Sequence, residues 1–315
     1  MNITVIVCTF NRWQCLTKAL GSVAASTLPD SVKWEVVVVD NNSSDQTWKV
    51  VHDFCCRHPG RFRYVFEPKQ GLSHARNAGI REAQGEILAF TDDDVTVAPT
   101  WLQNLTARLN NDGEWAGAGG RTLLAHPFSP PPWLGLEEPY NLGGALAALF
   151  DVGDRPCRLT RAPYGANMAF QKKMFEKYGT FRTDFGRCGK RMLSNEDTEF
   201  GWRLLDGGER LRYEPAAIVY HPVPEDRTHQ SYFLKWYFNY GRATVREWRR
   251  GPDIWRIPRR CFTFFKLLGV VLPVRTLRWV VTRNPQRRFF YRCSAWMTIG
   301  QIQEIYRQWR NAKAR

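Results

Sequence analysis

The chain has 315 residues, enough to bury a large core in one α/β domain or in two smaller domains. Hydrophobic residues make up 43% of it and aromatic residues 14%, which excludes an intrinsically disordered protein. The net charge of +15 is unevenly distributed, because residues 242–315 hold 18 Lys and Arg against 3 Asp and Glu, whereas the first 241 residues hold 27 of each sign. We therefore predict two differently built parts that meet near Gly241.

The cysteines and the apolar stretches bear on where the protein works. The eight cysteines are scattered, and the adjacent pair Cys55-Cys56 has no second pair at zinc-ligand spacing, which favours a reducing compartment. The N-terminus lacks the basic start and the long apolar stretch of a signal peptide. The apolar stretch 262–274 is interrupted by Lys266 and Pro273, and it is shorter than the ~20 residues of a spanning helix. We expect a cytoplasmic protein without a transmembrane helix.

Strand and helix patterns alternate along the chain. Strands are predicted over 3–8, 34–39, 63–66, 86–90, 211–213 and 217–220, helices over 11–22, 46–56, 73–83 and 196–205, and a proline-rich loop over 127–139. We expect Asp45 and Ser73 to cap the second and third helices. This order predicts a doubly wound α/β sheet, which binds ligands beyond the carboxyl ends of its strands. Thr9, Asp40 and Asp92 fall at such ends.

The acidic run Asp92-Asp93-Asp94 closes an apolar strand. Three adjacent carboxylates repel one another and desolvate badly unless a cation or solvent takes up the charge, so a divalent metal is the natural partner. Alternation along an extended segment would direct Asp92 and Asp94 to one site and Asp93 away from it. A solvated acidic turn before a helix near residues 99–101 is the alternative that this run alone leaves open.

Four segments in the first part of the chain, the last of which contains the acidic run, form an ordered set of motifs. They are Val7-Cys8-Thr9-Phe10-Asn11-Arg12, Val38-Val39-Asp40-Asn41-Asn42-Ser43, Gly71-Leu72-Ser73-His74-Ala75-Arg76-Asn77-Ala78-Gly79 and Phe90-Thr91-Asp92-Asp93-Asp94. In this order they resemble the bacterial-type members of glycosyltransferase family 2. The resemblance implies an inverting enzyme with a GT-A fold, which is a Rossmann-like mixed sheet, mostly parallel and flanked by helices. It also implies a nucleoside-diphosphate sugar donor, with UDP as the default.

The resemblance also implies roles for individual residues. Thr9, Asn11 and Arg12 would line the nucleotide pocket, Asp40 would bond the base, Arg76 would lie near the base and diphosphate, Asp92 and Asp93 would belong to the donor site, and Asp94 would bind Mn²⁺ or Mg²⁺ as part of a DXD motif. A carboxylate at a strand end can accept from a base N–H, and a guanidinium offers a forked donor to phosphate. Asp40 as a turn cap and Arg76 as a solvated helix residue remain alternatives.

Inverting transfer needs a base that deprotonates the acceptor hydroxyl. Residues 194–203 resemble the family's Glu-Asp motif, in which Asp197 would be the base and Glu196 would position it or the acceptor. An acidic helix start without catalysis is the alternative. The family more often has glycine where this chain has Asn195. His221 is a candidate third metal ligand, with a structural role as its alternative.

The basic tail interleaves arginines with tryptophans and with apolar patches such as Phe262-Thr263-Phe264-Phe265; the tryptophans are Trp248, Trp255, Trp279, Trp296 and Trp309. This mixture suits an amphipathic helix lying on anionic lipid, peripheral to the inner face of the plasma membrane. Nucleic acid is a less favoured partner, and an accessory helical subdomain with a solvated basic face is the third option.

We therefore predict a GT-A domain over 1–241, with a nucleotide-binding half at 1–110 and an acceptor half at 111–241, followed by a largely helical tail at 242–315. The predicted function is inverting transfer of a sugar to an envelope polysaccharide, a glycolipid or a lipid-linked acceptor. The alternative is a non-catalytic protein that binds nucleotide sugar or nucleic acid, but such a protein would not need both Asp94 and Asp197. The sugar, base, acceptor, linkage and oligomeric state are not specified by the sequence.

Overall fold

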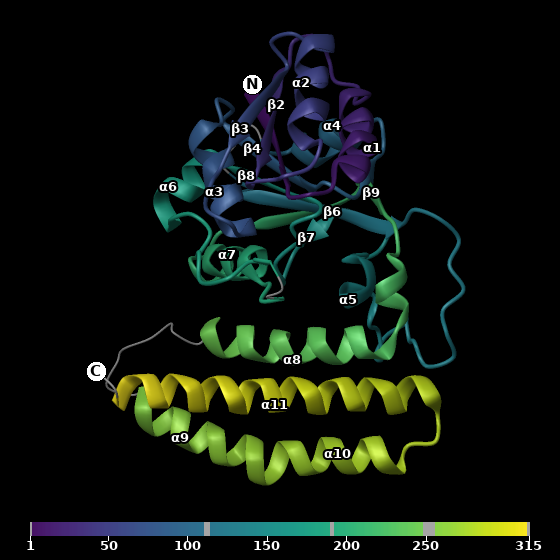
Figure 1. Ribbon diagram of the computed structural model, residues 1–315, viewed down its shortest axis with the longest axis vertical. Helices are drawn as coiled ribbons and strands as arrows, with labels where there is room; N and C mark the ends of the chain where they lie inside the picture. The colour runs from purple at the N-terminus through teal and green to yellow at the C-terminus, as the bar shows by residue number, and fades with distance from the viewer. Residues whose placement is uncertain (1, 110–113, 190–191, 248–255, 314–315) are drawn as a thin grey trace. The chain divides into compact units, whose positions relative to one another are not determined.

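The computed structural model describes residues 2–109, 114–189, 192–247 and 256–313 (Figure 1). In chain order its elements are β1 Asn2–Thr9, α1 Trp13–Ala24, β2 Lys33–Asp40, α2 Thr47–Arg57, β3 Phe62–Phe66, α3 Leu72–Glu82, β4 Ile87–Asp92, β5 Thr96–Val97, α4 Trp101–Thr106, β6 Gly117–Leu124, α5 Gly143–Ala147, β7 Cys157–Arg158, β8 Met168–Gln171, α6 Lys172–Tyr178, α7 Glu196–Asp206, β9 Leu211–His221, η1 Glu225–Thr228, α8 Gln230–Glu247, α9 Arg256–Lys266, the π-helical η3 Leu267–Val271, α10 Leu272–Val281 and α11 Pro285–Lys313.

The chain divides into two compact units, each described by itself. The N-terminal unit comprises Met1–His126, Ala148–Arg191 and Glu196–Pro222, and the helical unit comprises Pro127–Ala147, Met192–Asn195 and Val223–Arg315. Gly241, where the net charge of the chain changes, lies within the continuous helix α8. The domain division at residue 241 therefore remains a prediction that rests on charge alone.

The N-terminal unit is built on a mixed sheet with strand order β3-β2-β1-β4-β8-β6-β9-β5, and β7 pairs with β9. β1 is parallel to both β2 and β4, and β2 is parallel to β3. β8 runs antiparallel to β4 and β6. The predicted strands over 211–213 and 217–220 are one strand, β9, with a register shift where it passes the Gly120–Arg121 step of β6.

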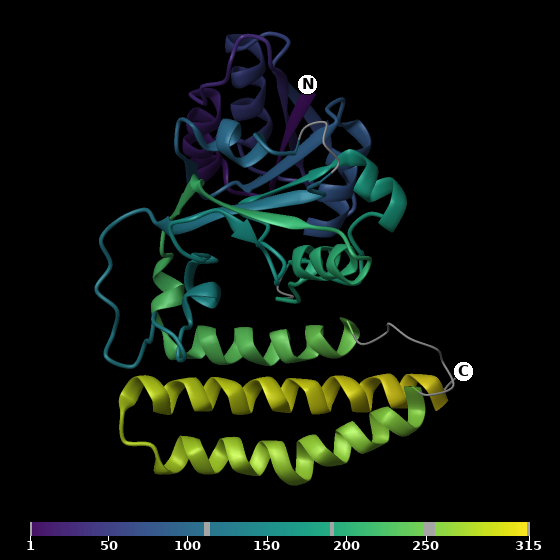
Figure 2. The same ribbon diagram turned by 180° about the vertical axis from the view of Figure 1, so that it is seen from behind.

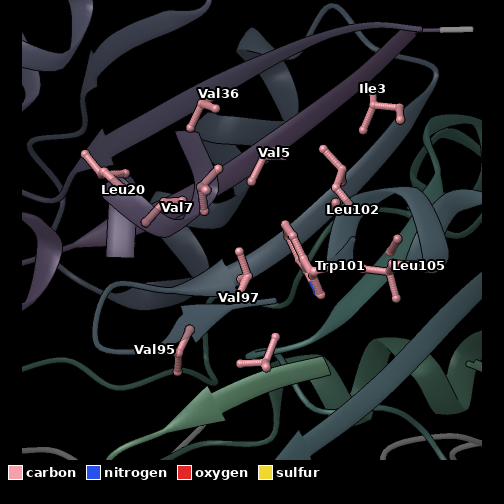
Figure 3. Close-up of a cluster of buried hydrophobic side chains, with 14 of the residues drawn as sticks. Ile3, Val5, Val7, Leu20, Val36, Val95, Val97, Trp101, Leu102 and Leu105 are labelled. Atoms are coloured by element: carbon pink, nitrogen blue, oxygen red, sulfur yellow. The ribbon is translucent and has the colours of Figure 1, made fainter. Parts of the chain in front are cut away.

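Helices cover both faces of this sheet, as Figures 1 and 2 show. On one face, alternate β1 residues Ile3, Val5 and Val7 pack in a cluster with side chains of α1, α2 and α4, among them the fully buried Trp101 (Figure 3). On the other face, Ile6 packs with side chains of α3, α6 and α7. Because successive strand residues point to opposite faces, the apolar run of β1 supplies both cores. The predicted α/β architecture is confirmed.

Helix α3 corrects one prediction. Ser73 was predicted to cap it, but the helix begins at Leu72, and the Ser73 hydroxyl instead donates to the carbonyl oxygen of Phe185 at 2.9 Å. Gly79 allows α3 to pack closely on β1, since a Cβ there would lie 2.5 Å from Cγ2 of Ile6. Helix α2 begins at Thr47 with Gln46 as its N-cap, so Asp45 lies one residue before the cap position, although its Oδ1 accepts from the N–H of Thr47 at 3.0 Å.

The helical unit is organised by α8 and α11, which lie side by side (Figure 1). They touch at glycines, since a Cβ on Gly241 would lie 2.0 Å from the carbonyl oxygen of Met297, and a Cβ on Gly300 equally close to that of Phe238. Trp133, in the predicted proline-rich loop, packs edge-on against Phe233 of α8 and Phe289 of α11. The described helices include none long and apolar enough to cross a membrane.

One carboxylate, Glu304, anchors the contact between these two helices. Its fully buried side chain accepts from Nε of Arg246 at 2.9 Å, and it also pairs with Arg242 and Arg307. Burial alone would raise the pKa of Glu304, but hydrogen bonds from Arg307, Arg246 and Gln308 outweigh it and lower the pKa to about 2. A segment rich in arginine is thus held together by one of its few acids.

We expect Glu304→Gln to lower the free energy of unfolding by about 3 kcal/mol, because it leaves the buried Arg246 without a counter-charge. The folded-state pKa lies below the ordinary value of 4.5, so the stabilisation should be complete above that pH and lost as pH falls towards 2. Chemical unfolding of the wild-type and Glu304→Gln proteins between pH 7 and pH 3 measures the difference in free energy of unfolding. A difference that stays constant with pH would contradict the stabilising role of the Glu304 carboxylate.

Candidate active site

The carboxyl ends of β1, β2 and β4 meet at one edge of the sheet. Thr9 pairs with Asp40 in the β1–β2 register, and Cys8 pairs with Asp92 in the β1–β4 register. Because all three strands are parallel, their ends lie together, and the residues that follow them form one site. This placement confirms the expectation that Thr9, Asp40 and Asp92 share an edge.

Asp40 and Asn11 brace the loops at this edge. The buried Asp40 accepts from the backbone N–H of Ser43 and from the hydroxyl of Tyr64, each at 2.9 Å. Asn11 adopts a positive φ of 51°, and its Oδ1 accepts from the N–H of Ser44 at 2.8 Å. These bonds fix the loop after β1 against the loop after β2, so both residues have a structural role at the place where the resemblance assigns the nucleotide.

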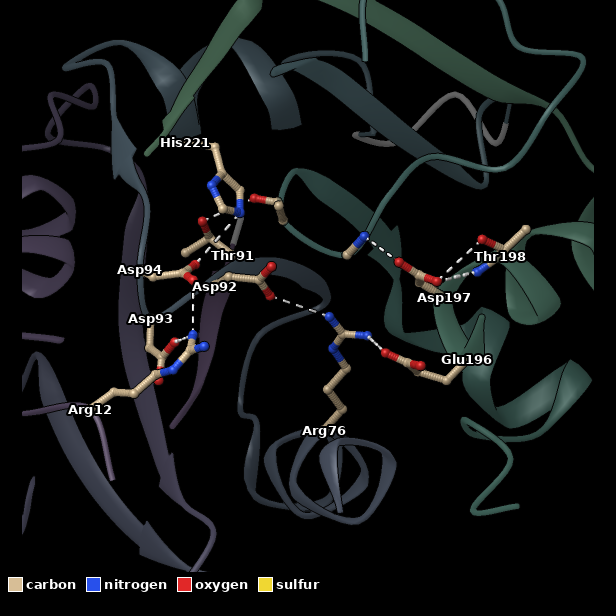
Figure 4. A network of polar contacts seen from close by, with 12 residues as sticks. Arg12, Arg76, Thr91, Asp92, Asp93, Asp94, Glu196, Asp197, Thr198 and His221 are labelled. Atoms are coloured by element: carbon tan, nitrogen blue, oxygen red, sulfur yellow. Dashed lines mark hydrogen bonds and ion pairs between the residues drawn. The ribbon is translucent and has the colours of Figure 1, made fainter. Parts of the chain in front are cut away.

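Only the first residue of the acidic run is extended, since β4 ends at Asp92 and a turn follows. The prediction that strand alternation directs Asp93 away from Asp94 is therefore wrong. Nη1 of Arg12 contacts Oδ1 of Asp93 at 3.2 Å and Oδ2 of Asp94 at 2.8 Å (Figure 4). Burial raises the pKa of Asp93, Asp94 raises it further, and Arg12 lowers it. Arg12 thus supplies part of the positive charge that the run requires.

Asp94 and His221 offer two ligands to one cation. Oδ1 of Asp94 lies 3.8 Å from Nε2 of His221, while Nδ1 of His221 is 2.6 Å from the carbonyl oxygen of Pro222. A carbonyl only accepts, so Nδ1 carries the proton, and in the neutral ring the Nε2 lone pair faces a carboxylate oxygen. Two acceptors facing each other fit a divalent ion. The described residues contain no group of three or more His, Cys, Asp or Glu that could hold a metal ion.

Arg76 joins the acidic run to the start of α7. Its guanidinium is almost wholly buried, with Nη1 2.6 Å from Oε1 of Glu196 and Nη2 3.4 Å from Oδ1 of Asp92 (Figure 4). The alternative of a solvated helix residue is therefore wrong. Gly165 makes room for this side chain, since a Cβ there would lie 2.1 Å from Nη2 of Arg76. The two motifs recognised separately in the sequence are one connected network.

Helix α7 opens on Glu196 and Asp197. Asn195, before them, has a φ of 85°, a left-handed conformation that explains why glycine is common at this position and why asparagine can replace it. Oδ2 of Asp197 accepts from the N–H of Gly165 at 2.6 Å, and Oδ1 accepts from the N–H of Thr198 at 2.7 Å. The Asp197 carboxylate is thereby oriented by backbone donors on two segments.

Glu196 is buried, and burial raises its pKa against the lowering effect of Arg76. Within the described residues its Oε2 atom has no hydrogen-bond partner, although it is shielded from solvent. A buried acceptor of this kind is costly unless a ligand or water satisfies it. This property distinguishes Glu196 from a purely solvated helix start.

Sequence reasoning missed two residues at the site. Gly165 bonds Asp197 and accommodates Arg76, and Tyr64 donates to Asp40. Neither residue lies in a motif, and their partners are distant in the sequence, so no local signal indicates them.

Comparisons with known proteins bear on the family and the fold of the chain. Residues 4–123 match the family model described as "Glycosyl transferase family 2". The chain is 28% identical to the succinoglycan biosynthesis protein ExoM of Rhizobium meliloti, over 77% of this chain and 74% of that protein. It is also 28% identical to the glucosyl-dolichyl phosphate glucuronosyltransferase of Haloferax volcanii, over 72% of this chain and 71% of the relative. Residues 4–123 carry the family assignment, which is glycosyltransferase family 2.

Among solved structures, this glycosyltransferase is similar to the mannosyltransferase PcManGT from Pyrobaculum calidifontis in complex with GDP-Man and Mn²⁺. The TM-score is 0.64, with 97% of this chain and 87% of that chain covered, at 19% sequence identity. A likeness at this identity concerns the fold, and it confirms the GT-A architecture expected from the four motifs.

We expect Gly165→Ala to lower turnover of this glycosyltransferase by about a hundredfold, because the added methyl group must displace Arg76 from Asp92 and Glu196. A sugar-transfer assay measures turnover. Gly21→Ala is the control, since a Cβ on Gly21 has no neighbour within 4 Å. Wild-type turnover in a folded Gly165→Ala protein would show that this packing does not serve catalysis.

Proposed function

We propose that this enzyme transfers a sugar, with inversion, from a nucleoside-diphosphate sugar to an envelope polysaccharide, a glycolipid or a lipid-linked acceptor. The observation that carries the proposal is the bridge from Asp92 through Arg76 to Glu196, because it connects the donor-side acidic run with the segment that bears the candidate base. The family assigned to residues 4–123 supplies the class of reaction.

In this proposal the donor lies across the carboxyl ends of β1, β2 and β4. Thr9, Asn11, Arg12, Asp40, Arg76, Asp92 and Asp93 form the donor site. Asp40 has acceptor capacity for a base N–H beyond its two internal bonds, and Arg12 is 43% exposed beside Asp94, which lets it face phosphate oxygens. UDP sugars are the first donors to test, and GDP sugars the second because PcManGT was solved with GDP-Man.

Asp94 and His221 would hold Mn²⁺ or Mg²⁺. When bound, the ion supplies Lewis-acid stabilisation of the leaving diphosphate. Arg12 occupies Oδ2 of Asp94, and this leaves Oδ1 on the side of His221. The carboxylate is thus held by one arginine in an orientation that serves a second cation.

Asp197 is the proposed base. It accepts the proton of the acceptor hydroxyl as the acceptor oxygen attacks the anomeric carbon and the bond from that carbon to the diphosphate breaks. The N–H groups of Gly165 and Thr198 keep the carboxylate in place during the transfer. Glu196, which precedes Asp197 at the start of α7, positions the acceptor through its Oε2 atom, which has no hydrogen-bond partner among the described residues.

The names of two relatives support the proposed class of acceptor. ExoM is named for succinoglycan biosynthesis, and the Haloferax volcanii enzyme is named for a glucosyl-dolichyl phosphate substrate. A polysaccharide or lipid-linked acceptor for this chain would place the enzyme on the inner face of the plasma membrane.

A non-catalytic nucleotide-sugar-binding protein is the alternative. Such a protein would have no use for the orientation of Asp197 by two backbone donors or for the buried Oε2 of Glu196.

We expect Asp197→Asn to reduce turnover by about 10²–10⁴-fold while the dissociation constant of the donor stays nearly unchanged, because the amide cannot accept the acceptor's proton. Calorimetric titration of donor and a turnover assay separate the two quantities. Asp206→Asn, an exposed position on the same helix, is the matched control. Undiminished transfer by Asp197→Asn would refute the assignment of the base.

We expect Asp94→Ala to weaken metal-dependent nucleotide binding by at least about tenfold. Removing a residue that only hydrogen-bonds a metal ligand already lowers metal affinity by about tenfold or more, and Asp94 is proposed to be a ligand itself. Thermal-shift screening of nucleotide sugars with and without Mn²⁺ or Mg²⁺ identifies the donor in the same experiment. Binding without metal serves as the control and should differ little between the proteins. An equal metal-dependent shift in both proteins would remove Asp94 from the metal site.

A further inference from the structure

The helical unit carries an exposed apolar stripe on α9, η3 and α10. Its members are bulky hydrophobic side chains with exposed fractions between 44% and 71%: Phe262, Phe265, Leu268, Val270, Val274, Leu277, Val280 and Val281. Scattered exposed hydrophobic residues are normal, but a continuous row of them marks a surface that meets another phase or molecule.

The other side of these helices is the packed one. Leu267 forms a buried cluster with Val245 and Ile305, against which Phe264 and Val271 also pack. Arg275 donates to the carbonyl oxygen of Ser294 and to Thr298, both on α11. The exposed stripe is therefore the face turned away from α11, and both ribbon views show α9 and α10 on the opposite side of α11 from α8 (Figures 1 and 2).

The π-helical turn Leu267–Val271 keeps the stripe continuous. Six of its members, Phe262, Phe265, Val270, Val274, Leu277 and Val281, follow one another at steps of 3, 5, 4, 3 and 4 residues, and the step of five ends within this turn. A π-turn holds about one residue more than an α-turn, so it resets the phase by about 100°. Without it, the apolar residues of α10 would face a different direction from those of α9.

The charge around the stripe has one sign. Residues 256–303 contain ten Lys and Arg and no Asp or Glu. Exposed basic side chains lie within and beyond the stripe, at Lys266, Arg278, Arg283, Arg287 and Arg288. Apolar side chains with arginine and lysine beside them match a bilayer with anionic headgroups, in which the apolar groups enter the acyl boundary and the cations remain at the phosphates.

We propose that the stripe from Phe262 to Val281 is the surface by which this enzyme lies on an anionic lipid bilayer, with α9 and α10 parallel to the membrane plane. The sequence-based expectation gave this role to the tail tryptophans together with the apolar patch Phe262-Thr263-Phe264-Phe265, and the proposal keeps Phe262 and Phe265 from that set. Trp279 and Trp296 pack against each other, and Arg292 stacks over both rings. Trp248 and Trp255 lie outside the described residues. Membrane binding by the stripe is argued independently of the proposed function. Only the idea that the membrane carries a lipid-linked acceptor rests on that function.

The test is sedimentation of the full-length protein, without donor, with vesicles of phosphatidylcholine mixed with phosphatidylglycerol. The double variant Phe265→Ser, Leu277→Ser should bind at least about tenfold more weakly, because it removes two apolar side chains that would enter the bilayer. The control Trp48→Ser, Val152→Ser changes two exposed apolar side chains outside the helical unit and should bind like wild type. Wild-type binding by the Phe265/Leu277 variant would overturn the proposal.

A second pair of variants tests the charge. Lys266→Gln, Arg283→Gln, Arg288→Gln should abolish the preference for phosphatidylglycerol over pure phosphatidylcholine, whereas Lys18→Gln, Lys49→Gln, Arg81→Gln should keep it. A wild-type dimer that becomes a monomer in the Phe265/Leu277 variant, with no vesicle binding, would assign the stripe to a second copy and refute the membrane. Transfer to a water-soluble acceptor analogue should persist in the stripe variants, so failure of the proposed catalysis is recognised separately.

Discussion

The buried guanidinium of Arg76 is the interaction on which the site depends. A charge with so little exposure is tolerated only where carboxylates surround it, and Asp92 and Glu196 approach it from separate segments of the fold. Neither carboxylate could move far without leaving the arginine unpaired. The N-terminal unit therefore fixes, through one ion network, the spacing between the end of β4 and the start of α7, which are the proposed donor and acceptor sides.

Much of this architecture could be predicted, because local rules determine it. The apolar run of β1 faces two cores, the polar residues that follow β1, β2 and β4 meet at one edge, and the Glu-Asp segment starts a helix. Asn195 is informative here. It departs from the family's glycine, yet it takes the left-handed backbone conformation that glycine adopts readily, so the turn before α7 is preserved by the residue type most tolerant of it.

The contacts between distant side chains could not be predicted. Alternation along a strand describes Asp92 but not Asp93 and Asp94, because the strand has already ended, and only tertiary structure shows that Arg12 reaches both. Glu304 is similar. In a count of charges it is one of three acids in a basic tail, whereas in the fold it is the buried partner of Arg246.

The π-turn between α9 and α10 makes the length of this segment matter as much as its composition. Deleting one residue from Leu267–Val271 would permit an ordinary α-turn, and every residue downstream would rotate by about 100° relative to α9. The apolar residues of α10 would then point in a new direction although no side chain had been exchanged. Homologues with a helix pair of equal hydrophobicity but one residue shorter would have a divided surface, so insertions and deletions here carry information that substitutions do not.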